Sequence, residues 1–241
     1  MKTIILIFSF VTGIILKPGG YAKIESDFFK TSSGKLKISF VGHASLIFEI
    51  KETVIHIDPW GELADYSSLP KADLILLTHH HPDHLDTNAI SKLIKNNTQI
   101  ILTQAAFNII RKGTVMNNGD KKTIEGIGIE AIPAYNVTAG RDKFHPKGRD
   151  NGYILTIGGK RIYIAGDTEN IDEMADLKNI DIAFLPMNQP YTMLPEQIVD
   201  AVGKIKPKIL YPYHYGDSDA GKLKRILSKN TQVEVRIRAL K

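Results

Sequence analysis

Short apolar or alternating runs follow one another along most of this chain, and most of them predict β-strands. The run Leu74-Ile75-Leu76-Leu77 is apolar throughout, as expected of a strand that is buried on both faces. Glycines separate many of the runs, and Gly158-Gly159 predicts a hairpin turn between two of them. The predicted strands cover residues 36–41, 45–50, 54–57, 74–77, 100–102, 115, 123–125, 127–132, 153–157, 161–165, 182–185, 209–211 and 233–237.

Helical periodicity is found in four segments between these strands. Asp86 is placed to cap a helix that runs to about residue 95 and carries Ile90 and Leu93 on one face. Pro195 stands in the first turn of another helix, where its missing N–H is tolerated. The predicted helices cover residues 86–95, 104–111, 195–205 and 220–227. Strands followed by strands alternating with helices, twice over, predict an α/β fold of two mixed sheets face to face with helices outside.

Residues 133–151 interrupt this regular pattern. They show almost no periodicity and are rich in Gly, Lys, Arg and Asn. An irregular segment of this length inside a compact domain is usually functional or disordered. The chain shows no internal repeat and no linker, so we expect one domain over residues 23–241.

The first 22 residues differ from the rest of the chain. Lys2 precedes an apolar stretch at residues 4–16, and Gly20 and Ala22 stand at the −3 and −1 positions of a cleavage site. The stretch is shorter than the about 20 residues that span a membrane, and it is typical of a secretory signal peptide over residues 1–22. A buried N-terminal strand and an uncleaved anchor are the alternatives. The signal peptide predicts a periplasmic or secreted protein with no stable membrane anchor after its removal.

The composition of the chain excludes some kinds of site and partner. The chain has 241 residues, 43% of them hydrophobic and 24% charged, which is ordinary for a globular protein with a substantial core. It has no cysteine, which excludes a thiolate zinc site. Removal of Lys2 and Lys17 with the signal peptide would lower the formal net charge of +5 by two. No run of five basic residues and no arginine–aromatic interleaving occurs, so we expect no nucleic-acid partner.

The most informative motif is His79-His80-His81-Pro82-Asp83-His84, directly after the apolar run at 74–77. A strand that stops at Thr78 places three imidazoles and a carboxylate at its carboxyl end, where a turn can bring several to one point. Imidazole nitrogen and carboxylate oxygen suit zinc and its first-row neighbours. A solvated histidine-rich loop or a tag is the alternative, but the cluster is internal and is interrupted by Pro82 and Asp83.

This H-x-H-x-D-H motif after a hydrophobic strand resembles the signature of the metallo-β-lactamase superfamily. The chain is most similar to the branch of small metal-dependent hydrolases that includes the ascorbate-6-phosphate lactonases. The resemblance runs from about residue 36 to the C-terminus and implies a four-layer αββα sandwich with the site at one edge between the sheets. Further matching segments occur in the expected order: Gly42-His43-Ala44-Ser45, Ile57-Asp58-Pro59-Trp60, Ala165-Gly166-Asp167-Thr168 and Tyr213-His214-Tyr215-Gly216.

The resemblance implies two divalent metal ions, with zinc as the first choice and manganese or iron as alternatives. The implied ligands are His79 and His81 for the first metal, Asp83, His84 and His214 for the second, and Asp167 as the bridge between them. Taken alone, Asp167 also fits an ordinary turn or cap, and His214 a hydrogen-bonded loop histidine. The hexapeptide favours the ligand interpretation of both.

The third ligand of the first metal departs from the commonest pattern. Many relatives place a histidine at about the position of Asn136, and this chain has none there. The nearest histidine is His145, in the irregular segment. We predict that His145 reaches back to complete the site. The alternative is a surface-loop histidine beside a two-histidine site, since spacing alone does not fix loop geometry.

Other residues receive supporting roles. The resemblance assigns His43 to substrate contact or proton transfer, and Asp83 to the management of protons at the leaving group. Asp58 is expected to orient a metal-binding imidazole. His56 and His80 are interpreted as structural. Weaker candidates for substrate contact are Lys147, Tyr213 and Tyr215.

These residues together predict a metal-dependent hydrolase that uses metal-activated water on a small ester, lactone or phosphoester. The chain has neither a cysteine nor a G-x-S-x-G nucleophile, in agreement with that chemistry. One alternative is a phosphodiesterase acting on nucleotides or lipid head groups. Another is a non-enzymatic, metal-dependent binding or sensor protein. The expected partner is a small-molecule substrate.

Overall fold

The computed structural model describes residues 24–229 and 232–241, and over these residues the chain forms two sheets of seven strands each. The predicted signal peptide, residues 1–22, lies outside the described residues. The first sheet contains β1 (Glu25–Thr31), β2 (Gly34–Gly42), β3 (Ser45–Ile50), β4 (Thr53–Ile57), β5 (Leu74–Leu76), β6 (Gln99–Leu102) and β7 (Thr114–Val115). The second contains β8 (Lys121–Ile124), β9 (Ile127–Ala134), β10 (Asp150–Ile157), β11 (Lys160–Ile164), β12 (Ile182–Pro186), β13 (Ile209–Tyr213) and β14 (Glu234–Val235).

The two sheets share one topology. Strands β1 to β4 are joined by antiparallel pairings, and β4 to β7 by parallel ones. Strands β8 to β11 are likewise antiparallel, and β11 to β14 parallel. Parallel neighbours need a crossover connection, and these crossovers carry the helices. The described helices are α1 (Thr87–Leu93), α2 (Gln104–Ile110), α3 (Pro195–Ile205) and α4 (Ala220–Leu227), with a 3₁₀ turn, η1 (Asp172–Asp176).

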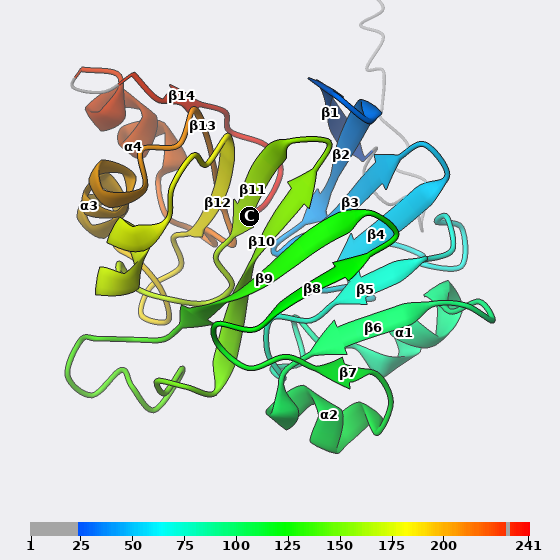
Figure 1. Ribbon diagram of the computed structural model, residues 1–241. Coiled ribbons are helices and arrows are strands. Elements are labelled where there is room, and N and C mark those ends of the chain that lie inside the picture. Colours follow the sequence, from blue (N-terminus) through cyan, green and yellow to red (C-terminus); the bar gives the residue numbers. More distant parts are fainter. Residues whose placement is uncertain (1–23, 230–231) are drawn as a thin grey trace, which may run out of the picture.

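The layers follow from which face of each strand is apolar. Helices α1 and α2 cover the outer face of the first sheet, and α3 and α4 that of the second (Figure 1). On β5, Leu74 and Leu76 join the core between the sheets, whereas Ile75 packs toward α1 and α2. Both faces of this strand are therefore buried, as its unbroken apolar run predicts. Two mixed sheets with outer helices confirm the predicted fold.

The core between the sheets contains an aromatic cluster. Phe184 of β12 stacks on Tyr211 of β13 with ring centroids 4.9 Å apart, and Phe40 of β2 lies 5.1 Å from Tyr211 across the two sheets. Buried aromatic rings carry large apolar area and favour such offset contacts. The cluster holds the sheets face to face and so fixes the relative positions of their strand ends.

The structure departs from the sequence prediction mainly at the sheet margins. β1 was not anticipated, since its pattern buries only Phe29 fully and gives little periodic signal. The last strand is shorter than predicted and covers only Glu234–Val235. Asp86 caps α1 as expected, accepting from the backbone N–H groups of Asn88 and Ala89. The irregular segment is the connection between β9 and β10, residues 135–149.

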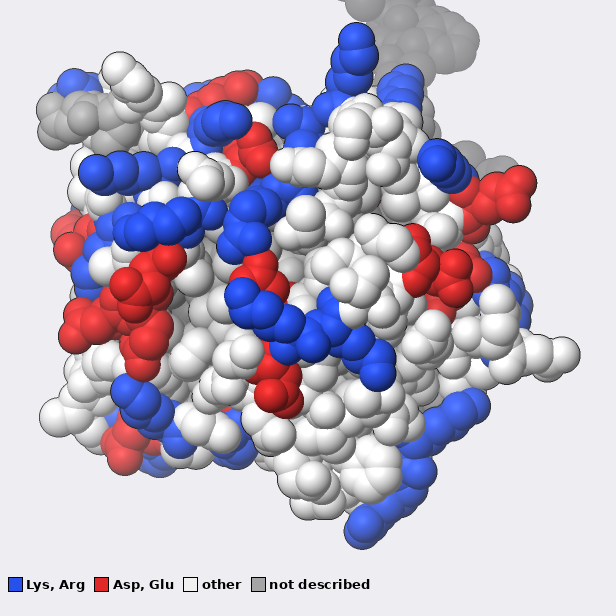
Figure 2. All heavy atoms as spheres, viewed as in Figure 1, with Lys and Arg blue, Asp and Glu red and all other residues white. Residues whose placement is uncertain are grey.

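Basic side chains form bands on the face shown in Figure 2, with acidic side chains beside them. Within the described residues, Glu130 pairs with Lys121 and Arg161, and Asp181 pairs with Lys208. This pairing neutralises part of the positive charge on the surface. No helix in the described part of the chain has both the length and the apolar character needed to cross a bilayer.

Candidate metal centre

The predicted site residues converge where strands from both sheets end. The hexapeptide follows β5, and its backbone turns back through hydrogen bonds from His84 N and Leu85 N to the carbonyl of His81. Asp167 follows β11 and His214 follows β13. β5 belongs to the first sheet and β11 and β13 to the second, and the packing of the two sheets brings these strand ends together although they are distant in sequence.

One group of potential metal ligands consists of His79, His81 and His145, whose ligand atoms lie within 4.8 Å of one another. His79 Nε2 lies 3.1 Å from His81 Nδ1. His145 is buried and comes from the β9–β10 connection, as the interpretation of the irregular segment required. The structure thus brings His145 to the hexapeptide rather than to the surface.

A second group consists of His43, Asp83, His84 and His214. Asp83 Oδ2 lies 3.0 Å from His43 Nε2, 3.6 Å from His214 Nε2 and 3.8 Å from His84 Nε2. His43 comes from the bend between β2 and β3, and its ring centroid is 3.7 Å from that of His214. Six of the eight histidines in the chain therefore lie in the two groups.

The Asp167 carboxylate lies between the groups. Its Oδ2 is 3.5 Å from His145 Nε2 and 3.4 Å from His214 Nε2, while its Oδ1 is 3.5 Å from His84 Nε2. A single carboxylate thus reaches imidazoles from both groups. This is the position that a bridging ligand requires.

The donor atoms in the centre fit divalent cations. Asp167 Oδ1 and the Nε2 atoms of His84, His145 and His214 are buried and have no hydrogen-bond partner among the described residues. Buried polar atoms are normally satisfied, so a convergent set of this kind marks a site for a ligand. Imidazole and carboxylate donors without thiolate suit zinc, manganese or iron.

The pKa values of the site histidines also favour the binding of a cation. Burial and neighbouring histidines hold the pKa of His79 well below its usual value, and burial with the nearby His145 lowers the pKa of His81 to about 4. Both imidazoles are therefore neutral near pH 7, with lone pairs available for a cation. Burial acts to lower the pKa of His84, but the carboxylates of Asp167 and Asp58 raise it to about 9. The carboxylates thus attract positive charge to this point.

Further side chains hold the imidazoles in place. Asp58 accepts from His84 Nδ1 at 2.8 Å, and Thr78 donates its hydroxyl to Asp58 at 2.6 Å. Asp58 therefore orients a site histidine, as predicted. Asn136 Oδ1 accepts a hydrogen bond from His145 Nδ1 at 2.8 Å. Residue 136 is the position where the commonest pattern has a histidine, and here its side chain holds His145 instead. Such contacts fix the tautomer that directs Nε2 into the site.

Backbone conformation at the centre is unusual. His43, Asp58 and His214 have φ values of 50°, 44° and 45°, in the left-handed region. Non-glycine residues adopt this region at a cost of about 1 kcal/mol or more each. Three such residues in one site mean that the surrounding structure, rather than local preference, sets these conformations.

Several other sequence candidates lie outside the centre. His56 is buried and within 2.9 Å of the Pro70 carbonyl, in agreement with a structural role. Lys147 pairs with Glu173 at 2.9 Å, and the Tyr215 hydroxyl donates to the Arg238 carbonyl. Tyr213 is fully buried. Lys147 and Tyr215 therefore have partners away from the two ligand groups, although the Lys147 side chain stays largely exposed. His80 is part of neither ligand group.

Sequence reasoning missed two supporting residues. Glu169 is fully buried and accepts hydrogen bonds from the backbone N–H groups of Val137 and Thr138 at 2.7 and 2.6 Å, which anchors the β9–β10 connection. A single glutamate carries no periodic signal, although its place two residues after Asp167 is a clue. Trp60 lies beside the site, with its ring centroid 5.0 Å from that of His43.

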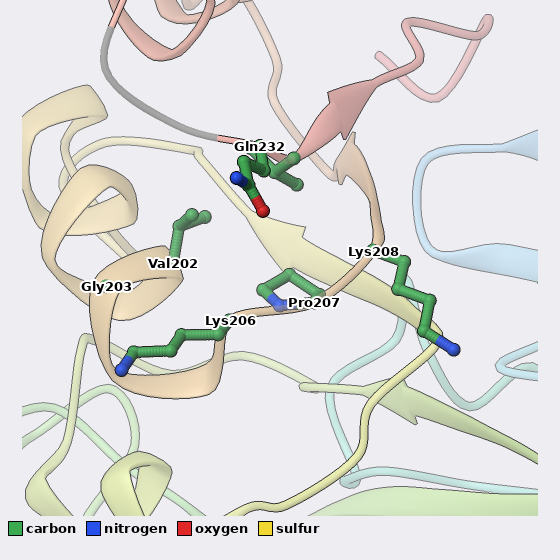
Figure 3. Close-up of a pocket in the computed structure, with 7 residues that line it drawn as sticks. Val202, Gly203, Lys206, Pro207, Lys208 and Gln232 are labelled. Atoms are coloured by element: carbon green, nitrogen blue, oxygen red, sulfur yellow. The ribbon is translucent and has the colours of Figure 1, made fainter.

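A separate cavity of about 420 Å³ lies at the end of α3 and shares no residue with the centre. In Figure 3, Lys206 and Lys208 direct their ammonium groups away from each other, and Val202 and Gln232 line the space between helix and sheet. The residues that line this cavity in the described part of the chain include no histidine or carboxylate.

Comparison with known proteins agrees with this geometry. The model of the β-lactamase superfamily domain matches residues 37–214. A metal-dependent hydrolase of the UPF0173 family from Nanoarchaeum equitans is 33% identical over 189 residues, which are 75% of this chain and 84% of the relative. A second one, from Pelotomaculum thermopropionicum, is 30% identical over 221 residues, 84% of this chain and 96% of the relative.

Two solved structures extend the comparison. A protein from Parabacteroides distasonis, described as a metal-dependent hydrolase, is 53% identical with a TM-score of 0.89, covering 91% of this chain and 100% of its own. A metallo hydrolase from Ignicoccus hospitalis is 26% identical with a TM-score of 0.73, covering 85% and 95% of the two chains. The chain therefore belongs to the β-lactamase superfamily and is a metal-dependent hydrolase.

Proposed function

We propose that this hydrolase cleaves a small ester, lactone or phosphoester with two divalent metal ions. The observation that carries the proposal is the Asp167 carboxylate between two groups of imidazoles whose lone pairs converge in a buried site. The proposed ligands are His79, His81 and His145 for one ion, Asp83, His84 and His214 for the other, and Asp167 for both.

Zinc, manganese and iron all accept this nitrogen and oxygen donor set, and zinc is the first choice. When bound, such ions polarise a carbonyl or phosphoryl oxygen and lower the pKa of water toward 7. The protein's contribution is to hold the donors at fixed distances. Asp58 and Asn136 do so from behind the imidazoles of His84 and His145.

His43 and Asp83 are proposed to manage protons at the leaving group. His43 Nε2 lies 3.0 Å from Asp83 Oδ2, which leaves Nδ1 as the atom that can give or take a proton. Burial acts to raise the pKa of Asp83, but the nearby imidazoles of His214 and His43 lower it overall, so this carboxylate stays ionised. Burial lowers the pKa of His43 overall, although the ionised Asp83 opposes this shift. The Asp83 carboxylate can also hold the His43 ring in one orientation.

Turnover assays test the reaction class. Protein stripped of metal with a chelator and then reloaded with zinc, manganese or iron is compared on p-nitrophenyl acetate, small lactones and bis-p-nitrophenyl phosphate. We expect metal-dependent cleavage of an ester or lactone. Cleavage of the phosphodiester alone would support the phosphodiesterase alternative. Metal binding without turnover of any substrate would contradict the proposal.

We also propose that the protein is exported to the periplasm or beyond, since residues 1–22 carry a charged start, an apolar stretch and a Gly20-Tyr21-Ala22 cleavage pattern. The exported form is expected to begin near Lys23. N-terminal sequencing of the exported fraction checks this, and an intact Met1 there would refute it.

A further inference from the structure

Exposed apolar side chains lie in two connections that also contact residues of the metal centre. Among the described residues, five large apolar side chains stand exposed on the surface. Phe28 lies in β1 and Ile109 in α2, but the other three lie in two neighbouring connections: Val137, Tyr191 and Leu194. Apolar side chains that cluster on a surface commonly mark a place where something binds.

The connection that carries Tyr191 and Leu194 runs along the edge of the centre. It begins at Met187, whose N–H donates to the His214 carbonyl at 3.3 Å. It continues to Tyr191, whose carbonyl accepts from Asn136 Nδ2 at 2.7 Å. Since Asn136 also holds His145, this connection spans from one ligand group to the other.

The β9–β10 connection completes the apolar surface. Phe144 directly precedes His145, and its ring meets that of Tyr191 edge-on with centroids 4.9 Å apart. Val137 directly follows Asn136, and its N–H is fixed by buried Glu169. Together Val137, Phe144, Tyr191 and Leu194 form what we call the apolar rim.

Defined hydrogen bonds fix the backbone that carries Tyr191 and Leu194. The Thr192 hydroxyl accepts from Asn188 N at 2.6 Å and donates to its carbonyl, which closes the turn below Tyr191. At the other end, the Gln197 side chain accepts from Leu194 N at 2.7 Å and starts α3. The backbone beneath these side chains is thus fixed, so their exposure is a built feature of this surface.

We propose that the apolar rim is the subsite for an apolar acyl group of the substrate, which makes the natural substrate an ester or lactone with an acyl chain. This inference rests on the proposed function. The apolar rim offers a chain several apolar contacts on the two connections that meet at Asn136, the residue that holds His145. A compact charged phosphoester would gain nothing from these contacts, because apolar surface stabilises only groups that leave water on binding.

A chain-length series tests the subsite. The ratio kcat/KM is measured for p-nitrophenyl acetate, butyrate and octanoate with the metal-loaded protein. We expect kcat/KM to rise roughly twofold per added methylene, about half the effect of complete burial because the rim stays partly wet. Tyr191→Ser and Leu194→Ser should flatten this dependence. Ile109→Ser, an equally exposed apolar residue on α2, is the matched control and should leave it unchanged.

A binding measurement separates the subsite from the chemistry. Trp60 is the sole tryptophan of the chain and lies beside His43, so its fluorescence reports on ligands at the centre. Octanoate should bind at least several-fold more tightly than butyrate, and Tyr191→Ser should remove that difference. If no ester or lactone is cleaved but octanoate shows this preference, the proposed function fails and the subsite stands.

Two outcomes overturn the subsite itself. One is ester cleavage by the wild-type protein with no dependence on chain length and no preference for octanoate. The other is a chain-length dependence that both Tyr191→Ser and Leu194→Ser leave intact. Thermal unfolding of each variant shows that it is folded, and Val137→Ser provides a third test position on the other connection.

Discussion

Replacement of Asn136 by alanine is the sharpest test of the proposed first metal site. Asn136 and His145 are both buried, and the Asn136 Oδ1 to His145 Nδ1 hydrogen bond is 2.8 Å long. Without the acceptor, the Nδ1–H of His145 is left unpaired or the proton moves to Nε2, the atom that faces Asp167. Either result weakens the lone pair that the site presents to a cation.

The magnitude follows from the buried hydrogen bond. A buried donor left without a partner costs about 1–3 kcal/mol. At about 1.4 kcal/mol per factor of ten, that corresponds to a loss of roughly 5- to 140-fold in metal affinity. His145→Ala removes the ligand itself and should lose more. Asn136→Asp keeps an oxygen acceptor at the same place and should recover most of the affinity.

The assay is a competition between the protein and a chromophoric chelator for zinc, with the first and second binding steps resolved. Asn108→Ala, an exposed amide on α2, is the matched control and should behave as wild type. The reasoning is refuted if Asn136→Ala binds zinc as tightly as the control. If His145→Ala also retains full zinc content and activity, the first site needs only two histidines.

Three further outcomes are expected. His84→Ala or His214→Ala should lower the metal content of the loaded protein from two ions to about one by elemental analysis, and unchanged content would contradict the ligand assignment. Glu169→Ala releases the hydrogen bonds to Val137 and Thr138, so it should destabilise the protein by about 3 kcal/mol in urea unfolding and increase proteolysis near Arg141. Zinc should raise the Tm of the stripped wild-type protein, because the folded state binds it far better than the unfolded chain. An unchanged Tm would mean that the imidazoles and carboxylates of the centre do not bind zinc in the folded protein.

The sequence predicted the two sheets and most of the site because the relevant signals are local. The apolar run before His79 marks a strand end, and the hexapeptide places its donors within one turn. The role of His145 was predicted from the resemblance and from the lack of a histidine at residue 136. Its geometry was not predictable, since it depends on a connection held by buried Glu169 and by Asn136.

The margins of the fold escaped prediction for a different reason. β1 and β14 lie at the edges of their sheets, where one side of the strand has no neighbouring strand among residues 24–229 and 232–241 and side chains are largely exposed. Edge strands show weaker alternation than central ones, because burial on only part of one face imposes the pattern. The apolar rim likewise carries no sequence signal, because exposed Val137 and Tyr191 look like ordinary core residues until the structure shows where they lie.

The metal centre contains residues in unfavourable backbone conformations and buried polar atoms without hydrogen-bond partners among the described residues. His43, Asp58 and His214 adopt left-handed backbone conformations, and buried donors at His84, His145 and Asp167 find no partner among the described residues. Each feature opposes folding of the metal-free chain. The aromatic core and the anchored connections must therefore hold the strand ends in place against this cost. A cation that satisfies these atoms at once would remove the unfavourable contribution, so we expect the arrangement that makes the metal-free protein less stable also to favour metal binding.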